Sequence, residues 1–188
     1  ESIFALKATY QDNINRIPAA AALMAPWLEQ ARTAADLAGA GLSILGHSLG
    51  NRLVLATLAL LQPADLRFPF VDHCIVNAAD VPAGLFASED GAMLRRSCAA
   101  ISVVWSPKDR TLEAAQQSGT VPDIGARLGR HGPAPGSDLR GVDVKELSGP
   151  LCHPLDVHSG LFSTPWPDDS HGAFVDGYAR LMRDRSWS

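Results

Sequence analysis

The stretch SILGHSLGNRLVL, residues 43–55, constrains the fold most strongly, because in it a β-branched apolar run meets a helix-like apolar run at a tight turn. The turn has the pattern Gly-x-Ser-x-Gly, with Ser48 between Gly46 and Gly50. Roughly one chain of this length in twenty contains the pattern by chance, so the strand-turn-helix setting is the stronger evidence. We expect a strained turn that exposes the Ser48 hydroxyl and needs both glycines, because larger side chains would collide with the neighbouring strand or helix.

Strand-like and helix-like segments alternate along the rest of the chain. Short apolar runs typical of buried parallel strands occur at residues 42–45, 74–77, 101–105 and 142–147. Residues 19–38 are rich in Ala and Leu, with Pro18 suited to a first helical turn and Gly39 to a stop. Residues 51–61 are apolar nearly all round, as in a helix covered on several sides. The alternation predicts an α/β fold in which helices flank a mainly parallel sheet.

The C-terminal part of the chain is richer in loop signals. Residues 118–141 and 148–170 hold many glycines and prolines, which predicts loops. An apolar stripe at helical spacing then predicts a final helix, and its members are Phe174, Tyr178, Leu181 and Met182. Three apolar side chains of the second loop are candidates for a substrate pocket wall, although plain anchoring of the loop explains them equally well: Leu161, Phe162 and Trp166. No repeat or linker divides the chain, so we expect one domain over residues 1–188.

Composition narrows the class of partner and the compartment. Sixteen basic against twenty acidic residues give a net charge of −4, and the absence of a basic run argues against a nucleic-acid partner. No apolar stretch reaches the ~20 residues that span a bilayer. The three cysteines have neither disulfide nor metal-site spacing and predict buried thiols; with no visible signal peptide they favour the cytoplasm. A monomer and a homo-oligomer both stay open.

Ser48 is the candidate nucleophile of the glycine-flanked turn. In this setting its Oγ is exposed at the carboxyl edge of the sheet, and the N–H of Leu49, at the positive end of the following helix, points to where an acyl oxyanion would form. The alternative is that the glycines only allow close packing and Ser48 caps the helix. A phosphate-binding loop does not fit, because neither Gly-Lys-Ser/Thr nor Gly-x-Gly-x-x-Gly is present. We expect His47 to shape the turn with its side chain directed away from that of Ser48.

A serine hydroxyl needs an imidazole to take its proton and a carboxylate to orient that imidazole. Two aspartates follow later strands, Asp109 in the turn SPKD and Asp80 after CIVNAA. We favour Asp109, because in folds of this type the acid most often follows the strand after next. Each aspartate could also cap a helix, and capping does not exclude catalysis.

Three of the six histidines follow the last predicted strand, where a loop lies over the turn: His153, His158 and His171. We favour His171 as the base because it directly precedes the final helix, and His158 is the alternative on position. His153, Asp156 and His158 could together be read as metal ligands. Histidines in proline-rich loops often bind nothing, so we expect no metal site.

With Ser48, Asp109 and His171 in these places, the sequence resembles the esterase and lipase superfamily of α/β-hydrolases, and more narrowly a bacterial group of α/β-hydrolases of unknown function. The matching stretches are GHSLGNRLVL, VNAADVPAGLF, VVWSPKDRTLEAAQ, and DVKELS followed by SHGAF, within residues 10–185. In that group an Asp in a Ser-x-x-Asp-Arg turn supplies the acid and a His-x-x-Phe segment supplies the base. The resemblance therefore implies Asp109 and His171.

The resemblance also implies strands ahead of the Ser48 turn, and the loop after one of them usually gives a second oxyanion N–H. The residues before position 42 look mostly helical, and TYQDNINR resembles a segment that follows those strands. We therefore expect an N-terminally incomplete chain whose sheet lacks its first strands and whose oxyanion hole, if nothing replaces them, holds Leu49 alone. Such a loss costs about 2.7–4 kcal/mol of transition-state stabilisation per absent donor.

Together these features predict a serine hydrolase that cleaves carboxylic esters through an acyl-enzyme, needs no cofactor and has a small ester as its partner. The short connection between residues 77 and 101 is too short for a helical cap, so we expect an open site and short to medium acyl chains. Two alternatives stay open. One is a non-catalytic hydrolase-like domain for binding or assembly, and the other is an acyltransferase that uses the same three residues.

Overall fold

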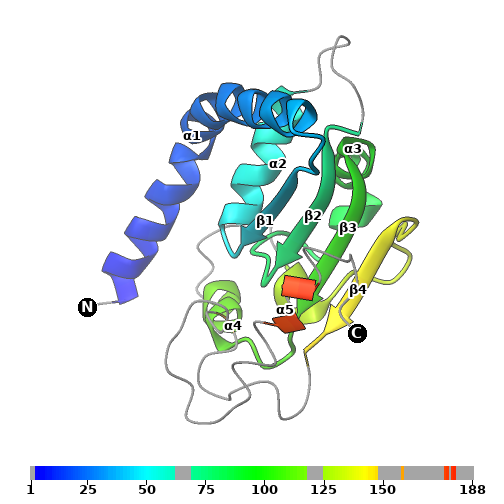
Figure 1. The fold of residues 1–188 in the computed structure, drawn as a ribbon. Helices are drawn as coiled ribbons and strands as arrows, with labels where there is room; N and C mark the ends of the chain where they lie inside the picture. The colour runs from blue at the N-terminus through cyan, green and yellow to red at the C-terminus, as the bar shows by residue number, and fades with distance from the viewer. Residues whose placement is uncertain are drawn as a thin grey trace.

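A four-stranded parallel sheet forms the centre of the protein (Figure 1). This computed structural model describes residues 3–61, 69–117, 125–147, 158, 176–177 and 179–180. The strands stand side by side in chain order, as β1 (Ser43–His47), β2 (Val71–Asn77), β3 (Cys98–Trp105) and β4 (Val142–Glu146). All four lie where the apolar runs predict them. The predicted α/β architecture, a parallel sheet flanked by helices, is confirmed.

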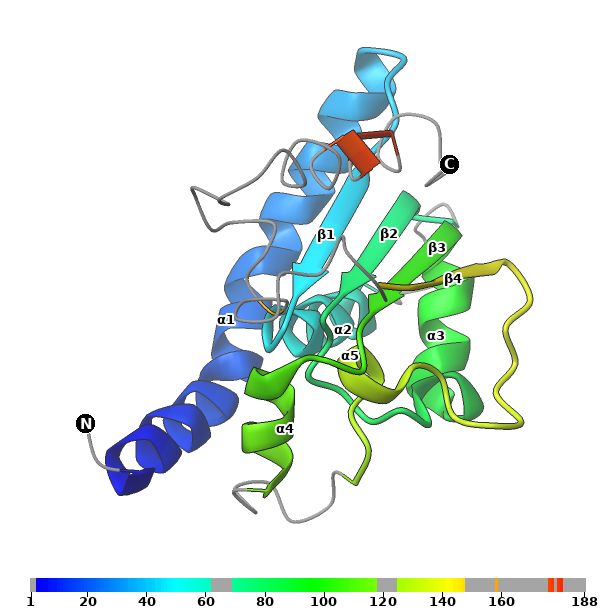
Figure 2. The same cartoon turned by 90° about the horizontal axis from the view of Figure 1, so that it is seen from below.

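The helices that connect β1 to β2 and β2 to β3 lie on one face of the sheet. α2 (Gly50–Leu60) connects β1 to β2 and packs against β1, while α3 (Glu89–Ser97) connects β2 to β3 and packs against β3. Crossovers between parallel strands are right-handed as a rule, so two that advance in the same direction place their helices on the same face. α2 and α3 do touch each other, and the long α1 (Ile3–Leu37) packs against α2. Figure 2 shows α2 between α1 and α3.

α1 begins earlier than the sequence predicts. Pro18 and Pro26 both lie inside the helix, so the prediction that Pro18 occupies its first turn is wrong. A proline removes one i→i−4 hydrogen bond and crowds the preceding turn, and a long helix accommodates it by bending. Figure 1 shows that the axis of α1 changes direction midway. The predicted stop is confirmed, because Gly39 has a φ of +62° and its N–H donates to the Asp36 carbonyl.

The core lies between the sheet and this helical layer. β2 and β3 supply its centre, where Val71, Ile75 and Val103 are fully buried. Each such side chain contributes about 1.5–3 kcal/mol relative to an exposed one. Cys74 and Cys98 are buried free thiols, as the cysteine spacing predicts, and a hydrogen bond to Cys74 together with burial raises the pKa of Cys98. Cys152 lies outside the described residues.

Three further helical segments complete the described chain. α4 (Arg110–Gln117) forms where the composition is helical, and η1 (Leu85–Ala87) is a short 3-10 turn before α3. α5 (Leu128–His131) lies within residues 118–141, so the prediction that this whole segment is loop is wrong. The reason is tertiary packing, because Leu128 is completely buried and α5 packs against β3. α4 and α5 lie at the end of the molecule toward which the strands point (Figure 1).

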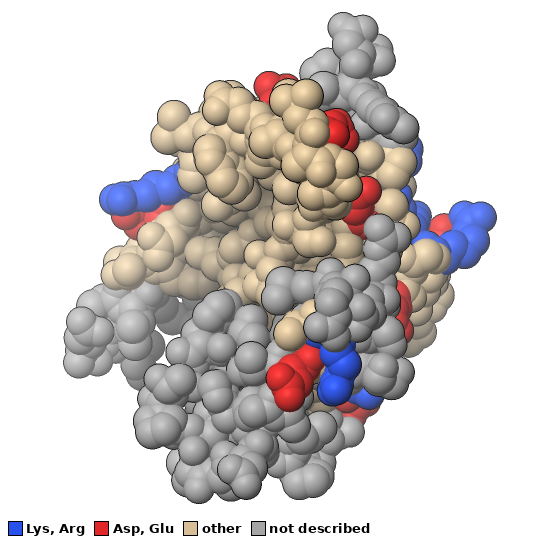
Figure 3. Space-filling model, in the orientation of Figure 1, with Lys and Arg blue, Asp and Glu red and all other residues tan. Residues whose placement is uncertain are grey.

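The surface separates charged from apolar regions. Figure 3 shows few charged side chains over α1, with basic and acidic residues interspersed around its margins. Among the described side chains, three large apolar ones of α1 are exposed: Leu23, Trp27 and Leu37. In the part of the chain that the structure describes, no helix has both the length and the apolar character needed to cross a membrane. Residues 176–177 and 179–180 are helical, as predicted for the final helix, but its four stripe residues lie outside the described part.

Candidate active site

The glycine-flanked turn joins β1 to α2 as the sequence predicts. β1 ends at His47 and α2 begins at Gly50, and Ser48 between them has a φ of +51°. This left-handed conformation is costly for a residue with a side chain and persists only where the surroundings enforce it. At Gly46 an added Cβ would lie 2.5 Å from Asn51 Oδ1, so a larger residue there would displace the buried Asn51 side chain. At Gly50 no described atom would lie within 4 Å, so the predicted collision there is wrong.

The backbone of Ser48 is fixed in both directions by the end of β2. Its N–H donates to the Asn77 carbonyl at 3.1 Å, and its own carbonyl accepts from the Asp80 N–H at 3.1 Å. The buried Asn51 amide donates to the carbonyls of Ser48 and Asn77, each at 3.0 Å. Asn51 is not among the predicted site residues, and only its place as a polar residue at the start of an apolar helix sets it apart in the sequence. These contacts hold the strained turn in place.

The side chain of Ser48 does not cap α2. Leu49 is the capping residue and no side chain caps the helix, whereas Ser48 Oγ lies 2.9 Å from His158 Nε2. Among the described residues, no acceptor bonds the backbone N–H of Leu49. It stands at the positive end of the α2 dipole and is available to a negatively charged oxygen.

Asp109 faces the other side of the same imidazole. Its Oδ2 lies 2.8 Å from His158 Nδ1, and its Oδ1 accepts the Leu112 N–H at 2.8 Å at the start of α4. The carboxylate is 1% exposed. Asp109 therefore both caps a helix and contacts a histidine, with one oxygen for each.

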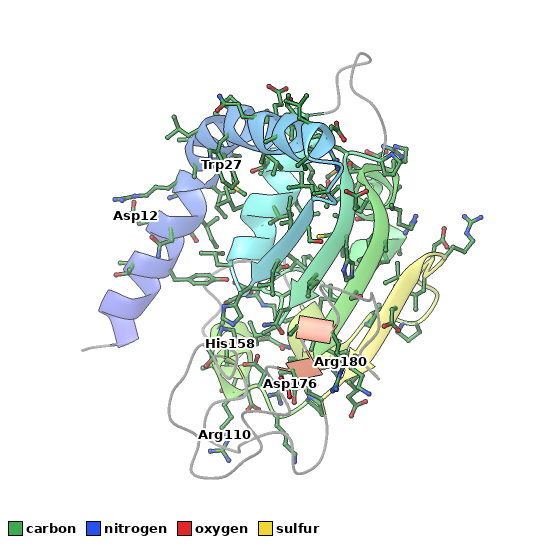
Figure 4. All side chains as sticks on the ribbon, in the orientation of Figure 1. Asp12, Trp27, Arg110, His158, Asp176 and Arg180 are labelled. Carbon is green, nitrogen blue, oxygen red and sulfur yellow. The ribbon has the colours of Figure 1, made fainter. Side chains whose placement is uncertain are left out.

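His158 is bound through its backbone as well as its ring. His47 Nε2 lies 2.5 Å from the His158 carbonyl, and the two rings are 4.9 Å apart at a tilt of 55°. Figure 4 shows His158 beside α4, at the end of the molecule where β1, β2 and β3 terminate. The favoured base, His171, lies outside the described residues, and the position between Ser48 and Asp109 is occupied by the alternative, His158. The contact of the His47 ring with the His158 carbonyl and ring is a feature that the sequence does not reveal.

Asp80, the alternative acid, has different partners. Its Oδ1 lies 2.8 Å from Arg127, both side chains are 1% exposed, and its Oδ2 accepts the hydroxyl of Tyr10. Burial, and then the hydrogen bond to Asp80, raise the pKa of Tyr10 to about 12, so the phenol stays a donor at neutral pH. Among the described residues, Asp109 is the carboxylate that contacts the imidazole.

A basic hollow lies beside the Asp109 turn. It has a volume of about 380 Å³ and is lined by Pro107, Lys108, Arg110, Glu113 and Arg130. Arg130 donates to the Asp109 carbonyl at 3.1 Å and pairs with Glu113 at 3.0 Å, which ties α5 to the start of α4.

Other predicted features of the site fall partly outside the described residues. No group of three or more metal-ligating side chains occurs within them, and of the three residues weighed as ligands only His158 is placed. Leu161, Phe162 and Trp166, the candidate pocket wall, are also outside. Between β2 and β3 the chain forms only η1 and α3, with no helical cap in that described connection.

Comparison with known families gives one result. The sequence profile described as "Alpha/beta hydrolase of unknown function (DUF900)" matches residues 19–148. The matched region holds all four strands, Ser48 and Asp109, and ends before His158. No curated protein and no solved structure matches the chain.

Proposed function

Because the chain belongs to this family of alpha/beta hydrolases of unknown function, we propose that it is a serine hydrolase that cleaves carboxylic esters through an acyl-enzyme. The observation that carries the proposal is the position of one imidazole, 2.9 Å from a serine hydroxyl and 2.8 Å from a buried carboxylate. Nucleophile, base and orienting acid have this arrangement on several unrelated folds. We assign these roles to Ser48, His158 and Asp109.

In the acylation step, His158 Nε2 takes the Ser48 Oγ proton as Oγ bonds to the ester carbonyl carbon. The electron pair of the carbonyl moves onto its oxygen, which accepts the Leu49 N–H. When this tetrahedral intermediate collapses, the bond to the leaving alkoxide breaks and Nε2 returns the proton to it. Water then repeats the sequence on the acyl-enzyme and releases the carboxylic acid.

Asp109 keeps the imidazole productive throughout these steps. Its Oδ2 accepts from Nδ1, so the other nitrogen, Nε2, is free of hydrogen and can act as the base. The negative charge also stabilises the imidazolium that forms. Because Oδ1 is held by the Leu112 N–H, the carboxylate is oriented before substrate arrives.

The Ser48 turn supports the same assignment. The left-handed φ of Ser48 is typical of the tight strand-to-helix turn that exposes a nucleophilic serine, and the Leu49 N–H follows it directly at the start of α2. One oxyanion donor of this kind contributes about 2.7–4 kcal/mol to transition-state stabilisation. The short connection between β2 and β3 favours an open site, and we propose esters of short to medium acyl chains as substrates.

The test is covalent labelling with a fluorophosphonate, which forms a bond only with an activated serine. We expect labelling of the wild-type chain at Ser48, and its loss in Ser48→Ala and in His158→Ala. His171→Ala is the matched control, because it removes the same residue type from the same part of the chain, and it should label like wild type. Hydrolysis of p-nitrophenyl acetate should follow the same order. Absence of labelling in the folded wild-type protein would refute the proposal, and loss of labelling only in His171→Ala would reassign the base.

A further inference from the structure

The turn that follows β2 contacts the nucleophile turn at both of its ends, through the Asn77 carbonyl and the Asp80 N–H. Ala78 has a φ of +41°, and its N–H donates to the Val104 carbonyl at 3.0 Å. Gly129 of α5 lies directly on this turn, since a Cβ there would be 2.2 Å from Ala78 C and Ala79 N. Two left-handed residues that are not glycine, Ser48 and Ala78, therefore each donate their backbone N–H to the next strand of the sheet, Ser48 to Asn77 of β2 and Ala78 to Val104 of β3. Such strain is maintained only by firm external contacts.

Asp80, in this turn, is held by contacts with three other parts of the chain. Its carboxylate pairs with Arg127 at 2.8 Å and accepts the Tyr10 hydroxyl of α1, and its carbonyl accepts Arg52 Nε of α2 at 2.7 Å. The segment of Arg127 is in turn paired with the chain beyond Asp80, because the Leu128 N–H donates to the Val81 carbonyl at 2.8 Å. The N–H of Asp80 is thus held against the Ser48 carbonyl.

The ion pair has no evident advantage for stability alone. Removing two charges from water costs about as much as their attraction returns, and apolar replacements of similar size are often as stable. The pair does restrict the Asp80 carboxylate, because one oxygen is in ion-pair contact with the guanidinium and the other accepts the phenol, so that a shift would lose one of the two contacts. Asp80 is joined to the backbone of Ser48 by one hydrogen bond, so a fixed Asp80 also fixes the Ser48 turn.

We propose that Asp80 and Arg127 are a positioning pair for the nucleophile, an inference that rests on the proposed function. They act through the Asp80 N–H, which holds the Ser48 carbonyl and so fixes the direction of Ser48 Oγ and of the Leu49 N–H. Among the described contacts, neither side chain of the pair reaches Ser48 Oγ or His158, and the pair takes no part in proton transfer.

The test separates positioning from folding by comparing single and double variants. Arg127→Met leaves a buried carboxylate without its cation, and we expect a lower Tm and slower labelling. The double variant Asp80→Asn/Arg127→Met removes both charges, and we expect its Tm to recover. Its fluorophosphonate labelling rate per folded molecule should stay about tenfold to a hundredfold below wild type, with KM for p-nitrophenyl acetate within about twofold. A double variant that labels as fast as wild type would overturn the inference.

Two further variants serve as a control and as a milder test of the positioning role. Arg140→Met is the matched control, because Arg140 pairs with Asp138 at 2.7 Å in an exposed position, and it should label at the wild-type rate. Tyr10→Phe removes one donor to Asp80 without creating a buried charge, and we expect a smaller loss of rate with kcat affected and KM unchanged. A Tyr10→Phe loss confined to Tm would count against positioning.

Amide hydrogen exchange distinguishes this inference from the proposed function. If wild type is not labelled, the proposed function fails, whereas exchange at residue 80 still reports whether the pair holds this N–H against Ser48. We expect exchange at residue 80 in the double variant to be at least about tenfold faster than in wild type, with the amides of α3 unchanged. Equal exchange in both proteins would refute the positioning role independently of any activity.

Discussion

Asp80 and Asp109 occupy equivalent places and have different partners. Each follows a strand of the sheet, β2 or β3, near its carboxyl end, and each carboxylate is 1% exposed. Asp109 contacts the imidazole of His158 and a backbone N–H at the start of α4. Asp80 contacts the permanently charged guanidinium of Arg127 and the phenol of Tyr10. An imidazole can exchange a proton and a guanidinium cannot. The comparison shows that the partner, and not burial or place on the sheet, decides which carboxylate can serve proton transfer.

The largest difference between the two aspartates is expected in turnover. Asp109→Asn keeps the cap of α4 through its amide oxygen, but its NH₂ would donate to His158 Nδ1 and leave the proton on Nε2. We expect kcat for p-nitrophenyl acetate to fall about 10⁴-fold, with only a small change in Tm. Asp80→Asn should lower kcat far less. Equal losses of kcat in the two variants would contradict the different roles of the two aspartates. A larger loss in Asp80→Asn would assign the imidazole-orienting role to Asp80.

The next difference concerns stability. Asp80→Asn leaves the guanidinium of Arg127 buried without a counter-charge, which costs about 3–5 kcal/mol of unfolding free energy. Urea unfolding at pH 7 should show this loss for Asp80→Asn and a much smaller one for Asp109→Asn. Unfolding of both variants at the same urea concentration would contradict this prediction, because the Asp80–Arg127 pair would then contribute no more to the free energy of unfolding than the Asp109–His158 pair.

A smaller effect is expected on the Asp109 side from His47. Its Nε2 contacts the His158 carbonyl, and the side-chain amide of glutamine can reach the same acceptor while leucine cannot. We expect His47→Leu to lower the labelling rate about tenfold, as for loss of one hydrogen bond of about 1.4 kcal/mol, and His47→Gln to restore most of it. Equal rates in the two variants would show that the ring contact, and not the hydrogen bond, matters.

The smallest effect is spectroscopic and concerns the Asp80 side. Tyr10 is one of two tyrosines, so in a Tyr178→Phe background the absorbance at 295 nm reports its ionisation alone. We expect a midpoint at about 12, because burial and then Asp80 raise the pKa of Tyr10, and a lower midpoint in Asp80→Asn. A raised pKa means that the phenol stabilises the fold below about pH 10 and loses this contribution as the pH rises toward that midpoint. An ordinary midpoint in wild type would remove Tyr10 from the contacts of Asp80.

Much of the architecture could be predicted because it depends on local pattern. β-branched runs mark buried parallel strands, and parallel strands bring their carboxyl ends to one edge, which places Ser48 and Asp109 there without tertiary information. The start of α1 could not be predicted, because the helix continues through Pro18 and its earlier part contacts a residue distant in the sequence, as Tyr10 does with Asp80.

The choice among histidines depends on information that the sequence does not hold. His158 and His171 both follow the last strand in loop-like sequence, and the path of a loop is not fixed by its composition. Arg127 is equally hidden, because it lies in a Gly/Pro-rich segment and pairs with a residue of another strand connection. Residues that act through polar contacts with distant parts of the chain leave no pattern in the sequence that would identify them.

Under the proposed function, the separate contacts of the two Asp109 oxygens link catalysis to the integrity of a short helix. The atom that starts α4 and the atom that holds His158 belong to one rigid carboxylate, so neither can turn without the other. Unwinding the first turn of α4 would therefore inactivate the protein while Ser48 remained untouched. A ligand that binds and distorts α4, for example from the basic hollow along its side, would act as an inhibitor that does not compete with substrate.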